Sequence, residues 1–197
     1  MEALYGFVLA ALALTGSPGP NVLSLAATGA AFGARNGLAY MAGLIAGMVA
    51  VMVVVASGLT GVVLALPGAR PVVAAMAAAY ILYLAFRIAT APPLAEAGGS
   101  GRRPSFTGGV YLSLVNPKAY AAMAALFSGF VLVAGRPLLD SGLKIALLVV
   151  IIALVNTGWL CAGAGLARLF RTRRLSRALN LAFAGLLVVS LAVALLL

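Results

Sequence analysis

The chain has no histidine, one cysteine (Cys161) and only three acidic residues among its 197 residues. A single thiol cannot form a disulfide within the chain, and a Cys/His metal site cannot be built without histidine. Backbone carbonyls and amides alone are a poor ligand set for transition metals. The acids Glu2, Glu96 and Asp140 lie near the ends of apolar runs or between them, so no acid–base pair is placed for catalysis. The sequence therefore predicts no enzyme, no metal site and no cofactor.

Charged residues of either sign are also scarce. They make up 8% of the chain, whereas hydrophobic residues make up 64%, and the mean hydropathy is +1.18. A soluble domain of this size does not need so much apolar surface, so we expect an integral membrane protein in contact with the lipid bilayer. No polar stretch is long enough to fold by itself. Residues 1–197 are therefore expected to form one transmembrane domain.

The net charge of +10 comes from 13 basic residues against 3 acidic ones. The basic residues stand in short segments between apolar runs, a pattern typical of membrane topology and not of nucleic-acid binding. Most of them fall in the first, third and fifth of these segments, namely Arg35, then Arg87, Arg102 and Arg103, then Arg168, Arg171, Arg173, Arg174 and Arg177. The second segment holds Arg70, and the fourth holds Arg136 and Lys144. The positive-inside rule places the odd segments in the cytoplasm and both termini outside.

Six apolar runs are long enough for transmembrane helices, which need about 20 residues each. They cover roughly residues 3–31, 37–66, 71–90, 108–134, 143–167 and 178–197. A linker rich in Pro, Gly and Ser, about 91–107, separates a first repeat of about 1–90 from a second of about 108–197. Three runs in each half give the halves opposite orientations in the membrane, the inverted-repeat design of many secondary transporters. The sequence thus predicts an all-α membrane protein with two inverted three-helix repeats.

Two breaks interrupt apolar runs at corresponding places in the two halves. Ser17-Pro18-Gly19-Pro20-Asn21 divides the first run, and Asn116-Pro117-Lys118 lies within the fourth. Proline removes a backbone donor and clashes with the preceding turn, so we expect the first and fourth helices to be broken. Paired interruptions of this kind are the best sequence indication of a transporter's binding site at the membrane midplane.

Lys118 is the only charge deep within an apolar run, and burying it costs about 2.5–3.5 kcal/mol on insertion scales. Two interpretations stay open: the side chain snorkels to the cytoplasmic face, or it faces a polar cavity and attracts an anionic group. Amides at the breaks and in the fifth run could bind a substrate or cap helix ends. The candidate substrate-binding residues are Pro18, Gly19, Pro20, Asn21, Asn116, Pro117, Lys118 and Asn156.

These residue types favour a carboxylate ligand. A half-helix that begins near Pro20 would direct free N–H groups at an anion. A cationic substrate would need a counter-charge that the predicted core lacks, so a neutral, zwitterionic amino acid fits better. Any coupled proton would pass through Lys118 or through water. Without a Gly-rich phosphate loop before a Lys-Ser/Thr pair, ATP-driven transport by this chain alone is not expected.

Small residues Ala39, Gly43 and Gly47 recur at four-residue spacing in the second run. They would let another backbone approach one face of that helix. The pattern suits packing within one subunit or contact between two subunits of a homodimer, and the sequence does not separate these alternatives.

The breaks resemble motifs of the LysE/RhtB family of bacterial amino-acid exporters. Ser17-Pro18-Gly19-Pro20-Asn21 resembles the family's first-helix motif, and Phe106-x-x-Gly109 with Asn116-Pro117-Lys118-Ala119 resembles its fourth-helix motif. Weaker similarities are Gly37, Gly43, Gly47 and Gly58, the stretch Tyr80-Ile81-Leu82-Tyr83-Leu84, and Trp159.

The resemblance implies six spans in a bacterial inner membrane, with both predicted termini then periplasmic. It also implies export of amino acids or derivatives such as homoserine and its lactone, driven by a proton or substrate gradient. Members of the family often carry an acid in the fifth helix, where this chain has Asn156. Judged on the residues alone, two other classes stay open: a small metal-ion or other solute exporter or channel, and a non-transport membrane scaffold subunit.

Overall fold

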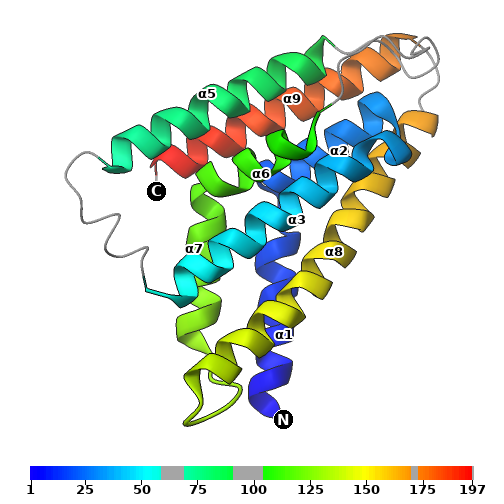
Figure 1. Cartoon of the computed structure of the whole chain (residues 1–197). Helices are drawn as coiled ribbons and strands as arrows, with labels where there is room; N and C mark the ends of the chain where they lie inside the picture. The colour runs from blue at the N-terminus through cyan, green and yellow to red at the C-terminus, as the bar shows by residue number, and fades with distance from the viewer. Residues whose placement is uncertain (59–68, 91–103, 170–172, 197) are drawn as a thin grey trace.

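The computed structural model describes residues 1–58, 69–90, 104–169 and 173–196, and all regular structure in these ranges is α-helix (Figure 1). The helices are α1 (Glu2–Gly16), α2 (Pro20–Phe32), α3 (Ala34–Ala56), α5 (Ala69–Ala89), α6 (Phe106–Val115), α7 (Pro117–Gly129), α8 (Pro137–Leu169) and α9 (Arg173–Leu196). Most of the predicted linker and residues 59–66 of the second apolar run lie outside the described residues, as do Arg102, Arg103 and Arg171.

The helices break at both places that the proline motifs predict. α1 and α2 are bent by 58° across Ser17–Gly19. The first helical residue after each break is a proline, Pro20 in α2 and Pro117 in α7. Proline suits this position because the first N–H of a helix has no partner within that helix. The prediction that the first and fourth apolar runs are broken is confirmed.

Within the described ranges, two helices, α3 and residues 137–167 of α8, are long and apolar enough to cross a membrane. The bent pair α1 and α2 would make a third span if it crosses as one unit. α6 is an apolar helix of only 10 residues, and α7 has 13, since the break at Asn116 divides their run. The predicted arrangement of six spans in two inverted repeats therefore stays a prediction.

α2 is the centre of the molecule, and every residue from Val22 to Phe32 is buried. It crosses α8 at short distance because each helix places a glycine against the backbone of the other, Gly29 in α2 and Gly163 in α8. A Cβ on Gly163 would strike the backbone of Ala26, and one on Gly29 would strike the backbone of Leu160. Close backbone contact at small residues is how helices associate where no hydrophobic effect drives them together.

The small residues of α3 serve a similar crossing with α6. A Cβ on Gly43 would meet the backbone of Phe106, and one on Gly47 would meet Val110 and Ser113. Gly43 and Gly47 are both buried by this contact, whereas Ala39 is exposed. The stripe is therefore used for packing within the subunit, and the homodimer stays a prediction that these glycines do not support.

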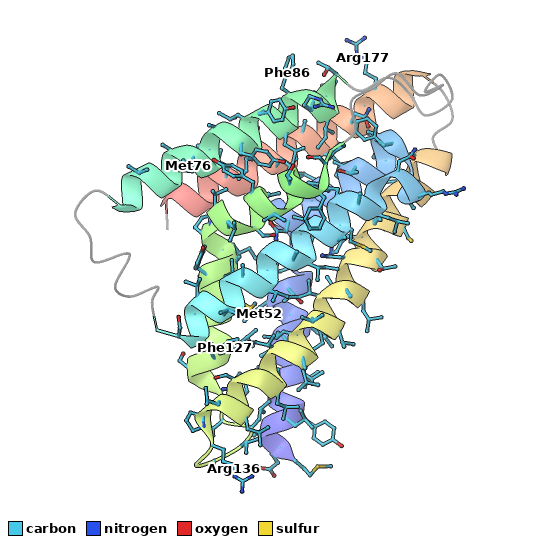
Figure 2. The ribbon with its side chains drawn as sticks, viewed as in Figure 1. Met52, Met76, Phe86, Phe127, Arg136 and Arg177 are labelled. Atoms are coloured by element: carbon cyan, nitrogen blue, oxygen red, sulfur yellow. The ribbon has the colours of Figure 1, made fainter. Side chains whose placement is uncertain are left out.

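α5 and α9 lie side by side and cover one side of the molecule (Figure 1). The end of α5, the beginnings of α3 and α9 and the end of α8 gather at one end, at the upper right of the view. Arg177 projects from that end, whereas Arg136 lies at the opposite end beside the α7–α8 connection (Figure 2).

The α7–α8 connection differs from its expected form. The fourth run was expected to extend to residue 134 and the fifth to begin at 143, but α7 ends at Gly129 and α8 begins at Pro137. Asp140 and Lys144, predicted to lie in a loop or near the end of a run, are instead buried in the first two turns of α8. Lys118 is thus not the only charge inside the packed helices.

Asp140 and Lys144 form a buried ion pair. Their ion pair measures 2.6 Å, and the Lys144 side chain is only 2% exposed. Lys144 Nζ also donates to the carbonyl oxygens of Phe127 and Phe130, while Asp140 Oδ1 accepts from the Leu132 and Val133 N–H groups. Backbone groups at the end of α7 and in the connection therefore form the remaining hydrogen bonds of both side chains. Burial of the ion pair does not leave an uncompensated charge.

Candidate substrate site

The two breaks meet at a small cavity of about 50 Å³. Five of the predicted site residues line it: Gly19, Asn21, Asn116, Lys118 and Asn156. The other three predicted residues, Pro18, Pro20 and Pro117, flank the cavity-lining residues at the breaks without lining the cavity. Residues from both halves of the chain therefore share one site, as the paired breaks predict.

The Lys118 side chain points at the break in the first helix. Its ammonium donates to the Ser17 carbonyl at 2.6 Å, to Ser17 Oγ at 2.8 Å and to the Pro18 carbonyl at 3.0 Å. These contacts can occupy all three N–H groups of the ammonium. The Lys118 side chain therefore lines the cavity, and its attraction for an anionic group stays a prediction.

The end of α1 is a suitable partner for a cation, since the C-terminal end of a helix carries partial negative charge. Trp159 of α8 adds a further donor there, with Nε1 3.2 Å from the Gly16 carbonyl oxygen. Carbonyl groups freed by the break are thus satisfied by side chains from α7 and α8. Carbonyl and hydroxyl oxygens at the break, and not a carboxylate, therefore offset the charge of the half-buried Lys118.

A pair of amides ties the two breaks together. Asn116 Nδ2 donates to Asn21 Oδ1 at 2.9 Å, and Asn21 Nδ2 donates to Ser113 Oγ at 3.0 Å. Ser113 in turn donates to the carbonyl of Leu44 in α3 at 3.0 Å. The chain of hydrogen bonds joins α2, α3 and α6, so these two asparagines act as interhelix links in this conformation.

The N-termini of the two half-helices differ in their capping. Asn116 caps α7, because its Oδ1 accepts the Lys118 N–H at 3.1 Å. α2 has Gly19 at the same position and no side-chain cap. The first N–H groups of α2 belong to Asn21 and Val22, and both residues line the cavity. Of the two half-helices, α2 is therefore the one whose N-terminus is left uncapped for an anion.

Asn156 of α8 is the least satisfied polar group of the site. Only 3% of the residue is exposed, and its side chain has no hydrogen-bond partner in the described part of the chain. A buried amide without a partner costs about 1–3 kcal/mol, and a ligand or water in the cavity would remove that cost. Asn156 offers both a donor and an acceptor to such a ligand.

Sequence reasoning missed one contributor to the site, Ser113, and treated Ser17 and Trp159 only as parts of a family resemblance. All three act through contacts with residues far away in the chain. Polarity within an apolar run was the available signal for Ser113. Trp159 offered a similar signal, because it is the only tryptophan of the chain.

A cavity that combines polar and apolar side chains where two broken helices meet, inside an apolar helical chain, is typical of a membrane transporter. The sequence model of the LysE type translocator family matches residues 12–197, nearly the whole chain. The chain therefore belongs to this family, and its predicted resemblance to it is confirmed. Membership makes it a membrane exporter of small solutes and not an enzyme. Neither the curated proteins nor the solved structures include a significant match.

Proposed function

We propose that the chain is a secondary-active exporter of neutral amino acids or their derivatives, such as threonine or homoserine, in a bacterial inner membrane. The observation that carries this proposal is the shared cavity, which combines an uncapped helix N-terminus, a lysine and an unpartnered amide. Each group matches one part of a zwitterion. The same residues offer nothing specific to a transition-metal ion.

In the proposed complex, the substrate carboxylate lies near the α2 N-terminus and Lys118. The N–H groups of Asn21 and Val22 and the ammonium would then share its negative charge. The α-ammonium group of the substrate meets the side-chain amide oxygen of Asn156. This amide has no other partner among the described residues. Asn21 and Asn116 hold the two breaks at the distance that this arrangement needs.

Charge distinguishes neutral from cationic substrates at this site. The described residues that line the cavity include a lysine and no acid. Asp140 is already paired with Lys144, and Glu2 lies in the first turn of α1. A lysine or arginine substrate would bring a second cation into an apolar core without a counter-charge, which is strongly disfavoured.

The cavity is smaller than the roughly 300–1,000 Å³ of typical ligand pockets, so substrate entry requires the helices to separate. Lys118 would then exchange its backbone partners at the α1 end for the substrate carboxylate. This exchange would couple binding to movement at the break between α1 and α2. We further propose that a proton or the substrate gradient supplies the drive.

The proposed orientation has both termini in the periplasm. The described ends that carry Arg35, Arg87 and Arg177 gather at one end of the molecule (Figures 1 and 2). The positive-inside rule assigns that end to the cytoplasm.

Counterflow in proteoliposomes tests the substrate class. We expect exchange of threonine, homoserine or leucine, and little exchange of lysine or arginine. Asn156→Leu should reduce the exchange of neutral substrates about tenfold, since a hydrogen bond to a charged group contributes roughly 1.5–3 kcal/mol. The matched control is Thr157→Ala, an exposed neighbour on the same helix that does not line the cavity. Equal exchange of lysine and threonine would contradict the proposal.

A further inference from the structure

A second cavity, of about 780 Å³, lies between the last turns of α5 and the first turns of α6. It shares no lining residue with the substrate site. Its polar lining consists of Tyr80, Tyr83, Arg87, Ser105, Thr107 and Tyr111. We refer to it as the α5–α6 groove. Its volume falls within the range of typical ligand pockets.

Among the described residues that line it, the groove has several hydrogen-bond donors and one positive charge, Arg87. Arg87 donates to the Tyr83 hydroxyl at 2.7 Å, and its guanidinium lies 5.7 Å from the centre of that ring. This contact holds the side chain over α5 and leaves other N–H groups of the guanidinium available. No carboxylate of the described ranges lies within ion-pairing distance of Arg87.

Two tyrosine hydroxyls add to these donors. The rings of Tyr80 and Tyr111 pack edge to face with their centres 5.0 Å apart, and neither hydroxyl has a hydrogen-bond partner in the described part of the chain. Gly108 leaves room for Tyr80, because a Cβ on Gly108 would strike the Tyr80 hydroxyl. The groove therefore presents a guanidinium and phenol donors, a set suited to a phosphate oxygen.

Exposed apolar side chains also lie on the two helices that form the groove. Leu82 is 50% exposed, Phe86 66% and Phe106 47%. Phe86 projects outward from α5, at the end of the molecule where Arg177 also lies (Figure 2). A soluble anion would gain nothing from these residues, whereas a lipid could place its acyl chains along them.

We propose that the α5–α6 groove binds the phosphodiester headgroup of an anionic phospholipid, with the acyl chains along exposed apolar side chains of α5 such as Phe86. Tyrosine and arginine at a helix end match the membrane interface, and basic pockets between helices on the cytoplasmic side bind such headgroups. The proposal does not depend on the transported substrate. A free phosphate shares the headgroup chemistry but not the acyl chains.

Native mass spectrometry of the delipidated, purified chain tests the proposal. We expect phosphatidylglycerol to bind at least about fivefold more tightly than phosphatidylcholine, and Arg87→Gln to remove that preference. Arg35→Gln, an exposed arginine on α3, is the matched control and should keep it. Tyr111→Phe, which removes only a hydroxyl, should weaken phosphatidylglycerol binding without a change in fold, as checked by circular dichroism.

Two results would overturn the assignment. One is an unchanged preference for phosphatidylglycerol in both Arg87→Gln and Tyr111→Phe. The other is full displacement of the lipid by millimolar inorganic phosphate, which would identify a site for a soluble anion and not for a lipid.

Discussion

Lys118 shows how a charged residue can be half-buried among apolar helices without a carboxylate partner. Its ammonium is bonded to two carbonyls and a hydroxyl at the end of α1. Sequence reasoning located this residue correctly because a lysine within an apolar run is costly and conspicuous. It could not identify the partner, because backbone carbonyls become available only when the other helix breaks.

Replacement of Lys118 should impair transport, while the protein still inserts into the membrane. We expect Lys118→Ala to reduce transport at least about tenfold, because each charge-assisted hydrogen bond contributes roughly 1.5–3 kcal/mol. Lys118→Arg should restore only part of the activity, since a planar guanidinium does not fit a site built for a compact ammonium.

Transport assays at matched protein levels in the membrane check this expectation, with the exposed Arg136→Ala as control. Near-normal export by Lys118→Arg and Lys118→Gln would show that the lysine only snorkels, and would remove it from the site.

Gly19 provides a way to displace Lys118 without changing it. A Cβ on Gly19 would lie 2.7 Å from Lys118 Cδ and 2.8 Å from its Nζ. The backbone there is extended, with φ −177°, so alanine adds no backbone strain. We expect Gly19→Ala to reduce transport several-fold. Gly16→Ala should be close to wild type, because a Cβ on Gly16 meets no atom within 4 Å.

A double-mutant cycle tests whether Gly19→Ala acts through Lys118. In a Lys118→Ala background, Gly19→Ala should have no further effect on transport. Additive losses in the double variant would mean that Gly19 acts through some other contact.

At the scale of elements, the sequence predicted the two breaks well because proline and glycine act locally. Asp140 and Lys144 were misplaced for the opposite reason. A polar pair at the edge of an apolar run is typical of a loop, and only the fold brings Asp140 against the Leu132 and Val133 N–H groups. A helix boundary that depends on such tertiary contacts cannot be predicted from the local pattern of polar and apolar residues.

The α2–α8 crossing should depend on Gly163. A Cβ there would strike the Ala26 backbone, which cannot move aside as a side chain could. We expect Gly163→Ala to lower the free energy of unfolding by about 1–3 kcal/mol, the usual cost of overpacking. Gly165→Ala, two residues further along α8 and facing open space, is the control and should be neutral or slightly stabilising.

Thermal unfolding in detergent measures both variants. The same midpoint for Gly163→Ala and Gly165→Ala would mean that α2 and α8 do not cross as closely as described.

At the scale of the whole molecule, the paired breaks predicted correctly that residues distant in the chain share one site. Lys118 and Ser17 meet across the fold, and Asn116 and Asn21 do the same. The α5–α6 groove could not be predicted from the sequence, because its tyrosines and Arg87 suit an ordinary helix end. That groove exists only because α6 returns to the last turns of α5.

The central claim is that the substrate occupies the cavity between the two breaks. Ala119 lines this cavity, is 5% exposed and carries no polar role. In a Cys161→Ala background, Ala119→Cys places a single thiol there. The exposed Ala134, in the α7–α8 connection, provides a reference thiol in Ala134→Cys that a substrate should not cover.

The most direct measurement is the rate at which a small water-soluble thiol reagent labels these cysteines in proteoliposomes. We expect the cysteine at position 119 to react, and saturating threonine or homoserine to slow its labelling several-fold while lysine does not. Labelling at position 134 should not change with any amino acid. A cysteine at position 119 that never reacts, or that reacts at the same rate with and without every neutral amino acid tested, would contradict the claim.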